Sequence, residues 1–209
     1  MNRTIALILI LYILLTGCQK ELKPSEMDPD DLPDERAFQD EFTRDFLQSI
    51  DETRPGYYPF LSATGNYKMD FPGDGNVSKA FYRKIKGYEA FSASIPGQGY
   101  FTLHFDDSRT IENLPYYLDA FQGRIGKEIN LEMLEIDSKV IYYNFFHRKN
   151  YEHHVAYLHP KNNNGGLEII YTLDCLEGFN CDKPNSNEKQ DILNWIKSIQ
   201  FTYRDEGKD

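Results

Sequence analysis

Hydrophobic and polar residues alternate along most of the chain between residues 66 and 174, a pattern that predicts strands with one buried face. In residues 99–106, for example, Phe101, Leu103 and Phe105 alternate with Thr102 and His104. Glycine-containing turns separate several of these stretches, so consecutive strands are expected to pair antiparallel. The strands are expected near residues 66–71, 78–86, 88–95, 99–106, 128–136, 139–147, 152–160, 166–174 and 200–203.

A helix is expected before the first of these strands. Phe38, Phe42 and Phe46 fall four residues apart, which predicts one apolar face on a helix from Asp34 to about Ile50. The aromatic face is expected to pack on the domain's own core, with docking of a partner as the alternative. The stretch TRPGYYP, residues 53–59, is expected to end the helix.

Two further helices are expected later in the chain. The first spans residues 111–121, with Pro115 in its first turn and its apolar residues on one face. The second is the last helix of the chain and begins at Ser186 or Asn187, which caps it. The order of elements is thus helix, strands, helix, strands, helix. This order predicts an α+β fold, a meandering and mostly antiparallel sheet with helices packed on its faces.

The N-terminus carries a different pattern, an apolar run from Ile5 to Leu15 that follows Arg3. At about 1.5 Å per residue, this run spans roughly 16 Å as a helix, about half of a hydrocarbon core of ~30 Å. A transmembrane helix is therefore not expected. The length and the basic start are typical of a signal peptide.

The run ends in Leu15-Thr16-Gly17-Cys18, which resembles the lipobox of bacterial lipoproteins. The resemblance implies that residues 1–17 are a signal peptide cleaved before Cys18, and that diacylglycerol and palmitate on Cys18 anchor the chain to a membrane. Several acyl chains on one cysteine are needed for stable anchoring. An ordinary signal peptide followed by a chance cysteine is the alternative. Gln19, in place of an aspartate, favours the outer membrane in a two-membrane organism.

Charge is unevenly distributed behind the cysteine. Residues 19–52 contain twelve Asp and Glu against four Lys and Arg, whereas residues 53–209 contain 21 against 18. The segment 18–33, rich in acids and proline, is expected to be a flexible tether, with a calcium site as the alternative. We expect one α+β domain over 34–204 and a short tail over 205–209. Nucleic acid is not expected as a partner, because the chain has no basic footprint.

Three cysteines occur, and lipidation of Cys18 would leave Cys175 and Cys181 as a pair. In an oxidising compartment, the short loop CLEGFNC between them predicts a structural disulfide. Two free thiols or a metal pair are the alternatives. The spacing of five residues does not match redox or zinc motifs.

Three stretches resemble the PsbP-like α/β/α sandwich, a group that includes small bacterial lipoproteins. They are YKMDFP before a Pro-Gly turn, NLPYYLDAF, and ILNWIKSIQF. The resemblance covers about residues 64–203 and implies a binding or assembly factor, with no catalytic residues to carry over.

The histidines of residues 145–160, FFHRKNYEHHVAYLHP, raise the question of a metal site. His147 lies opposite His153 across the expected hairpin if the register allows it, with Glu152 nearby. These three residues form the candidate metal site. The alternative is that the imidazoles lie on a solvated strand face near a turn, and this interpretation is favoured.

Other candidate chemistry is sparse. The chain has no G-x-S-x-G motif for a nucleophilic serine, and paired acids for glycoside hydrolysis would have to be recognised in three dimensions. Adjacent tyrosines must place one ring outward on a strand, and exposed tyrosines suit binding surfaces. The candidate binding surface comprises Tyr116, Tyr117, Tyr142 and Tyr143.

These patterns together predict a lipid-anchored extracytoplasmic protein of the cell envelope that binds an envelope protein or a small ligand. We expect no catalytic activity and no cofactor. The alternatives are a metal-dependent or hydrolytic envelope enzyme that uses the His147, Glu152 and His153 region, and a surface protein that binds glycans through its tyrosines.

Overall fold

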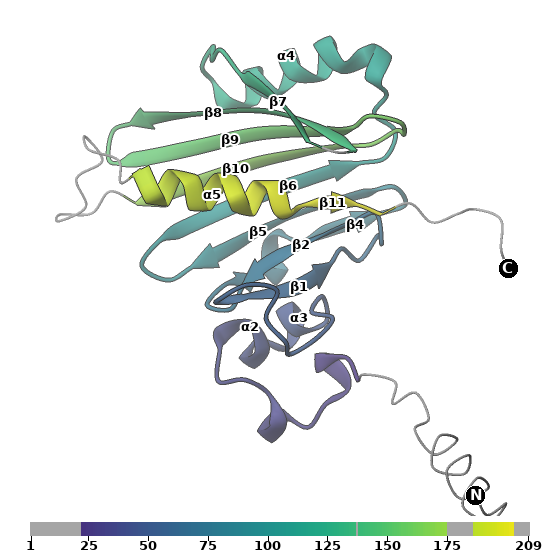
Figure 1. The fold of residues 1–209 in the computed structure, drawn as a ribbon, viewed down its shortest axis with the longest axis vertical. Helices are drawn as coiled ribbons and strands as arrows, with labels where there is room; N and C mark the ends of the chain where they lie inside the picture. The colour runs from purple at the N-terminus through teal and green to yellow at the C-terminus, as the bar shows by residue number, and fades with distance from the viewer. Residues whose placement is uncertain (1–21, 137, 175–185, 203–209) are drawn as a thin grey trace, which may run out of the picture.

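A computed structural model of the chain describes residues 22–136, 138–174 and 186–202 (Figure 1). The helices are η1 Pro24–Glu26, η2 Pro29–Asp31, α2 Arg36–Gln39, α3 Glu41–Arg44, η3 Lys79–Phe81, η4 Ile111–Asn113, α4 Leu114–Ile125 and α5 Ser186–Ser198. The strands are β1 Tyr57–Leu61, β2 Tyr67–Pro72, β3 Asn76–Val77, β4 Arg83–Ile85, β5 Tyr88–Ile95, β6 Gly99–Asp106, β7 Glu132–Ile136, β8 Lys139–Arg148, β9 Tyr151–Pro160, β10 Gly166–Asp174 and β11 Gln200–Phe201.

The strands form two antiparallel sheets. The larger has eight strands in the order β3-β5-β6-β10-β9-β8-β7, with β4 also paired to β5, and the smaller has the order β1-β2-β11. Strands β6 and β10 are neighbours although α4 and three strands separate them in the sequence. The long connection through α4 therefore lies over one face of the large sheet before the chain returns to its centre.

The two faces of the large sheet bury different partners. One face packs against the three-stranded sheet, α5 and the N-terminal helices, through a core that includes Phe60, Phe101 and Trp195. The opposite face packs against α4, where Phe121 meets Val155 and Tyr157 of β9. In Figure 1, α4 lies at one end of the molecule and α2 and α3 at the other. The predicted α+β fold, with a mostly antiparallel sheet and helices on its faces, is confirmed.

The expected helix from Asp34 to Ile50 is wrong as a single element. Two four-residue helices, α2 and α3, replace it, and Asp40 between them is extended at φ −83° and ψ 109°. The Asp40 carboxylate accepts hydrogen bonds from the Thr43 amide at 2.8 Å and the Thr43 hydroxyl at 2.6 Å. Aspartate thus caps the second helix instead of continuing the first.

The aromatic face of this region lies against the domain's own core. Phe38 is fully buried, and the Phe46 ring stacks on Phe60 with centroids 5.1 Å apart. Phe42 is half-buried and contacts Tyr82 edge-on at 5.2 Å. Intramolecular packing therefore accounts for the phenylalanine spacing.

The acidic segment differs from the expected flexible tether over the part that the structure describes. Residues 24–31 form the turns η1 and η2, each stabilised by proline at its start. Pro24 is buried and Leu32 packs against the core. The folded domain therefore begins before residue 34, because this segment has apolar anchors among its acids.

Most expected strands match the structure, and two observed strands, β1 and β3, were not predicted. Strands β5, β6 and β10 coincide with the expected ranges, whereas residues 78–86 divide into η3 and the short strand β4. Strand β1 lies where a turn was expected, and its Pro59 is tolerated because β1 is the edge strand of the small sheet. Strand β3, of two residues, was also missed.

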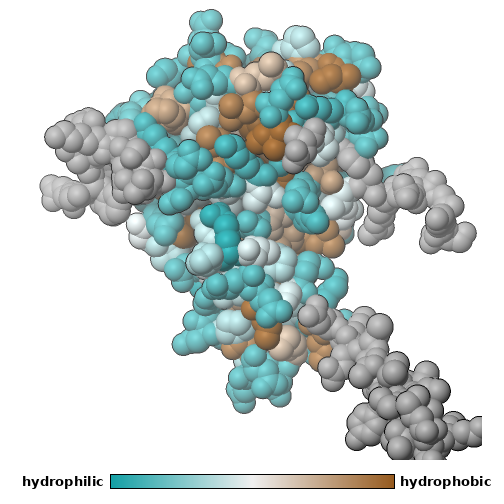
Figure 2. Space-filling model, in the orientation of Figure 1, coloured by the Kyte–Doolittle hydropathy of each residue, from teal (hydrophilic) through white to brown (hydrophobic). Residues whose placement is uncertain are grey.

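Cys18, Cys175 and Cys181 lie outside the described residues, so the lipid attachment and the disulfide stay predictions. No helix in the described part of the chain is long and apolar enough to cross a membrane. In the orientation of Figure 2 the surface is mostly hydrophilic, with hydrophobic groups over β7 to β9 and among the N-terminal elements at the lower end.

Candidate functional site

The histidines of the β8–β9 hairpin lie in a register fixed by its short turn. Lys149 and Asn150 connect the strands, and Lys149 has a positive φ of 56°. In this register His147 pairs with Glu152, and Phe146 pairs with His153. Directly paired residues share a face, so His147 and Glu152 lie together whereas His153 points to the opposite face.

Glu152 is the centre of a buried hydrogen-bonded chain. Its two carboxylate oxygens lie 2.7 Å from His147 Nε2 and 2.6 Å from His154 Nε2. The other ring nitrogen of His154, Nδ1, lies 2.6 Å from the Tyr143 hydroxyl. Glu152 and His154 are 3% and 0% exposed, so this chain is closed to solvent except at His147.

The protonation pattern follows from burial. Desolvation lowers the pKa of His154 although the neighbouring Glu152 opposes the shift, so the imidazole is neutral at neutral pH. Its Nε2–H then donates to Glu152 and its Nδ1 accepts from Tyr143. Burial also raises the pKa of Tyr143, which stays a neutral hydroxyl donor. Glu152, His154 and Tyr143 thus satisfy one another's hydrogen-bonding groups inside the protein.

Of the three predicted metal ligands, only His147 and Glu152 therefore lie together. His153 is separated from His147 and Glu152 and lies 3.0 Å from the Thr172 hydroxyl through its Nδ1. Among the described residues, no group of three or more His, Cys, Asp or Glu side chains is placed to hold a metal ion. His154 is not one of the three predicted ligands, although its spacing of two from Glu152 on one strand places both side chains on one face.

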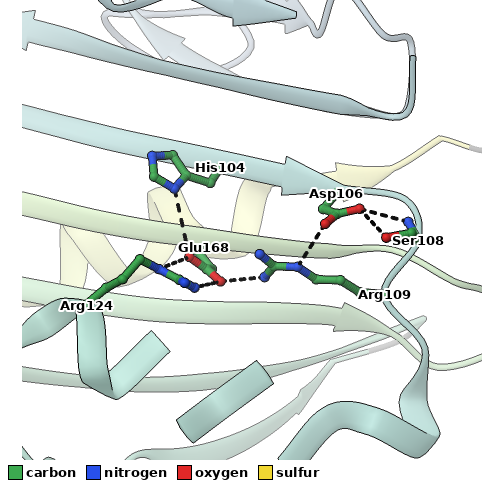
Figure 3. A network of polar contacts seen from close by, with 6 residues as sticks. All are labelled: His104, Asp106, Ser108, Arg109, Arg124 and Glu168. Carbon is green, nitrogen blue, oxygen red and sulfur yellow. Dashed lines mark hydrogen bonds and ion pairs between the residues drawn. The ribbon is translucent and has the colours of Figure 1, made fainter. Parts of the chain in front are cut away.

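A second polar cluster, around Glu168, lies on the opposite face of the large sheet and was missed (Figure 3). Glu168 on β10 is 3% exposed, and Arg109 Nη1 donates to its Oε1 at 2.5 Å. Arg124 of α4 donates to both carboxylate oxygens, with its Nε 3.0 Å from Oε2. His104 Nδ1 approaches Oε2 at 3.9 Å. The signal that could have found this cluster is a single acid inside the apolar stretch LEIIYTL.

The Glu168 cluster ties three elements together. Glu168 comes from a central strand, Arg124 from α4 and Arg109 from the segment that leads into α4. Gly166 leaves room for this approach, because a Cβ there would lie 2.6 Å from Arg109 Cδ. Glu168 raises the pKa of Arg109 against the opposing effect of desolvation. The cluster holds α4 on the sheet by charge as well as by apolar packing.

The four candidate tyrosines do not form one surface. Tyr116 is 71% exposed on α4, while its neighbour Tyr117 is half-buried under a cation–π contact with Arg109. Tyr142 is half-buried beneath α4, and Tyr143 is buried on the other face. Tyr116 is the one ring of the four that solvent reaches freely.

A hollow on the small sheet, which we call the outer cleft, has a volume of about 380 Å³. Its floor is the solvent-facing side of β1 and β2, including Pro59, Leu61, Lys68 and Asp70. Its walls come from segments distant in the sequence: Gln48, Thr53, Ser198 and Gln200. Asp70 also pairs with Arg54 at 3.1 Å, and Arg54 lies over the Tyr57 ring at 3.5 Å.

Comparison with known proteins places the chain in one family. A family model described as "Putative lipoprotein YvcA" matches residues 33–200. The protein "Putative lipoprotein YvcA" of Bacillus subtilis (strain 168) is 27% identical over 198 residues, which cover 86% of this chain and 82% of that relative.

One solved structure, a crystal structure from Bacteroides thetaiotaomicron VPI-5482 at 1.50 Å resolution, superimposes with a TM-score of 0.43 and 17% identity. The match covers 72% of this chain and 49% of that one, so the chain spans about half the length of the solved protein. The family model, by contrast, covers most of this chain. The chain belongs to the lipoprotein family described as "Putative lipoprotein YvcA".

Proposed function

We propose that this protein is a lipid-anchored binding protein of the bacterial cell envelope, which holds a polypeptide segment of another envelope protein in the outer cleft. The anchor is the lipid on Cys18, the cysteine of the Leu15-Thr16-Gly17-Cys18 stretch. Membership of a lipoprotein family supports this part of the proposal. The domain works outside the cytoplasm, and it acts by binding and not by catalysis.

The outer cleft is the observation that carries the binding role. Its volume of about 380 Å³ lies within the range of roughly 300–1,000 Å³ typical of ligand sites. Loop, strand and helix-end residues far apart in the sequence converge on it, which gives the site a fixed shape. It has an apolar floor at Pro59 and Leu61 and polar groups around it, the combination that binding sites use for affinity and orientation.

The lining chemistry favours a polypeptide segment as the ligand. The side-chain amide of Gln200 can donate and accept hydrogen bonds, as a peptide backbone does, and the Gln48 amide can do so beside the hydrogen bond that its Nε2 donates to the Phe46 carbonyl at 2.9 Å. Lys68 is exposed at the cleft and offers a cation, while the Asp70 carboxylate is shared with Arg54. Apolar side chains of a ligand would rest on Pro59 and Leu61.

Site-specific photo-crosslinking in intact cells tests this function. Benzoylphenylalanine in place of Lys68 projects into the outer cleft and should form a discrete adduct with one envelope protein. The same probe in place of Tyr116, which lies on α4 across the large sheet, is the matched control and should not form that adduct. Leu61→Trp should fill the cleft and abolish the Lys68 adduct while leaving the fold intact.

Two results would contradict the proposal. The absence of any discrete adduct at position 68 would remove the outer cleft as a binding site. The same adduct from positions 68 and 116, or one that persists in Leu61→Trp, would show contact unrelated to the cleft.

A further inference from the structure

A basic and apolar strip runs along one edge of the large sheet. We call it the basic edge, and it comprises Lys79, Phe81, Arg83, Lys84, Ile85 and Lys86. It carries four positive charges and no acid. None of its four cations forms an ion pair with another residue of the described ranges.

Two large apolar side chains stand in the open within this strip. Phe81 is 69% and Ile85 is 68% exposed. Among the described strands, β4 pairs with β5 alone, and all three of its residues are exposed. Lysines on an edge strand commonly prevent unwanted strand pairing. That role explains the charges but leaves the exposed Phe81 and Ile85 unexplained, whereas apolar groups rimmed by polar ones mark interaction surfaces.

The basic edge lies beside the start of the folded chain. Lys23 and Lys84 line the same hollow, of about 440 Å³, together with Phe42 and Tyr82, and Asp45 is the one carboxylate in that lining. Lys79 Nζ lies 5.8 Å from the Phe42 ring centroid. In Figure 1 β4 lies on the right at about mid-height, above the N-terminal helices and below α4.

Chain length links this surface to the anchor. Leu22, the first described residue, is four positions after Cys18, so their Cα atoms are at most about 14 Å apart. This step rests on the proposed lipidation of Cys18. A lipid at Cys18 would bring the membrane surface within reach of the basic edge.

We propose that the basic edge is a second membrane contact, which binds anionic phospholipid headgroups through its four cations and seats Phe81 and Ile85 at the interface. Cationic clusters next to a membrane anchor bind anionic lipids, and interfacial aromatic and aliphatic side chains add apolar burial. The contact holds the large sheet edge-on to the membrane, with α4 at the far end. The outer cleft then has a fixed orientation relative to the bilayer.

Depth-dependent fluorescence quenching tests this contact. The full lipidated protein is reconstituted into phosphatidylcholine vesicles with or without a quarter of phosphatidylglycerol, with brominated acyl chains as quencher. Phe81→Trp places a reporter in the basic edge, and Tyr116→Trp is the matched exposed control on α4. Trp195, which is 2% exposed, contributes the same background to both. We expect quenching of Phe81→Trp on the phosphatidylglycerol vesicles and none of Tyr116→Trp.

A second experiment, on protein without a lipid, tests the basic edge independently of the anchor. Residues 18–209 with Cys18→Ser contain the whole described fold and carry no acyl chain. Sedimentation with the anionic vesicles should show salt-sensitive binding, weakened about tenfold or more when Lys79, Arg83, Lys84 and Lys86 are all changed to Gln. Binding here would stand even if Cys18 proved to be unmodified.

The proposal is overturned by either of two results. Equal quenching of Phe81→Trp and Tyr116→Trp on the lipidated protein would show that the basic edge has no preferred place at the surface. Vesicle binding of the unlipidated chain that is absent, or unchanged by the fourfold Gln substitution, would show that anionic lipid does not recognise it.

Discussion

Glu152 accepts a hydrogen bond at each carboxylate oxygen, from His147 and from the buried His154. Glu152→Gln keeps the shape of the side chain but presents an amide donor to one of these two nitrogens. Because a buried group is then left unsatisfied, we expect a loss of about 1–3 kcal/mol in the free energy of unfolding. Urea denaturation at neutral pH measures it.

Glu135→Gln is the control for that substitution. Glu135 pairs with Lys161 at 3.2 Å, but its side chain is 61% exposed, so its removal should cost less than about 1 kcal/mol. A loss for Glu152→Gln as small as the loss for Glu135→Gln would contradict a structural role for the buried chain.

His154 gives the fold a pH dependence of known sign. Burial lowers its pKa in the folded state below the value of about 6.5 expected in the unfolded chain. Between these two pKa values the unfolded chain binds more protons, so the folded state loses stability as the pH falls below about 6.5. A titration of the imidazole ring followed by NMR should give a midpoint below about 6.5, and a midpoint at or above it would be inconsistent with burial.

For individual residues, the face of a strand on which a side chain lies could be predicted, but the side chains that it contacts could not. Alternation placed Glu152 and His154 on one face, yet the interpretation chose His153 because it assumed a different hairpin register. The turn at Lys149 and Asn150 sets that register. Lys149 has a positive φ, which a sequence usually indicates by a glycine, and no glycine stands in this turn. Glu168 was overlooked because its two arginines are far from it in the sequence.

Among the elements, α4 depends on one buried carboxylate. Glu168→Gln removes the charge that pairs both Arg109 and Arg124 and leaves the mostly buried Arg109 with only a longer contact, to Asp106 at 3.7 Å. Breaking a buried ion pair from one side costs about 3–5 kcal/mol, so we expect marked destabilisation and faster hydrogen exchange of the α4 amides.

The double variant Glu168→Met with Arg109→Met is the companion to that measurement. Removing both buried charges should restore much of the lost stability, because Arg124, the charge left without Glu168, has a side chain that is 43% exposed and can be hydrated. If Glu168→Gln left the α4 amides as protected as in the unaltered protein, the cluster would not hold the helix on the sheet.

The elements that could be predicted are those with long, regular patterns. Strands β5, β6 and β10 and helix α5 follow directly from period and caps. The predicted N-terminal helix is interrupted at Asp40. Its side chain caps a new helix there, although the phenylalanine spacing favours one continuous helix. Strand β1 was not predicted because Pro59 is typical of a turn. At the edge of a sheet, however, the N–H that proline lacks is not needed for strand pairing.

For the molecule as a whole, the proposed lipid anchor and the fold together define an orientation. The chain enters the domain near the basic edge, because Lys23 and Lys84 line one hollow. Helix α4, which carries the exposed Tyr116, lies at the far end (Figure 1). The two proposed contacts thus have separate places, the membrane at the sheet edge and the polypeptide ligand in the outer cleft. Sequence patterns predicted the anchor, but they could not predict the outer cleft, because its walls converge only in the folded chain.

The proposed orientation at the membrane begins with the lipid at Cys18. The most direct measurement is mass spectrometry of the N-terminal peptide from protein purified from membranes. We expect a chain that begins at Cys18 and carries a diacylglycerol group, and we expect Cys18→Ser to abolish both the modification and the cleavage before residue 18. An unmodified Cys18, or a mature chain that begins at another residue, would contradict the account.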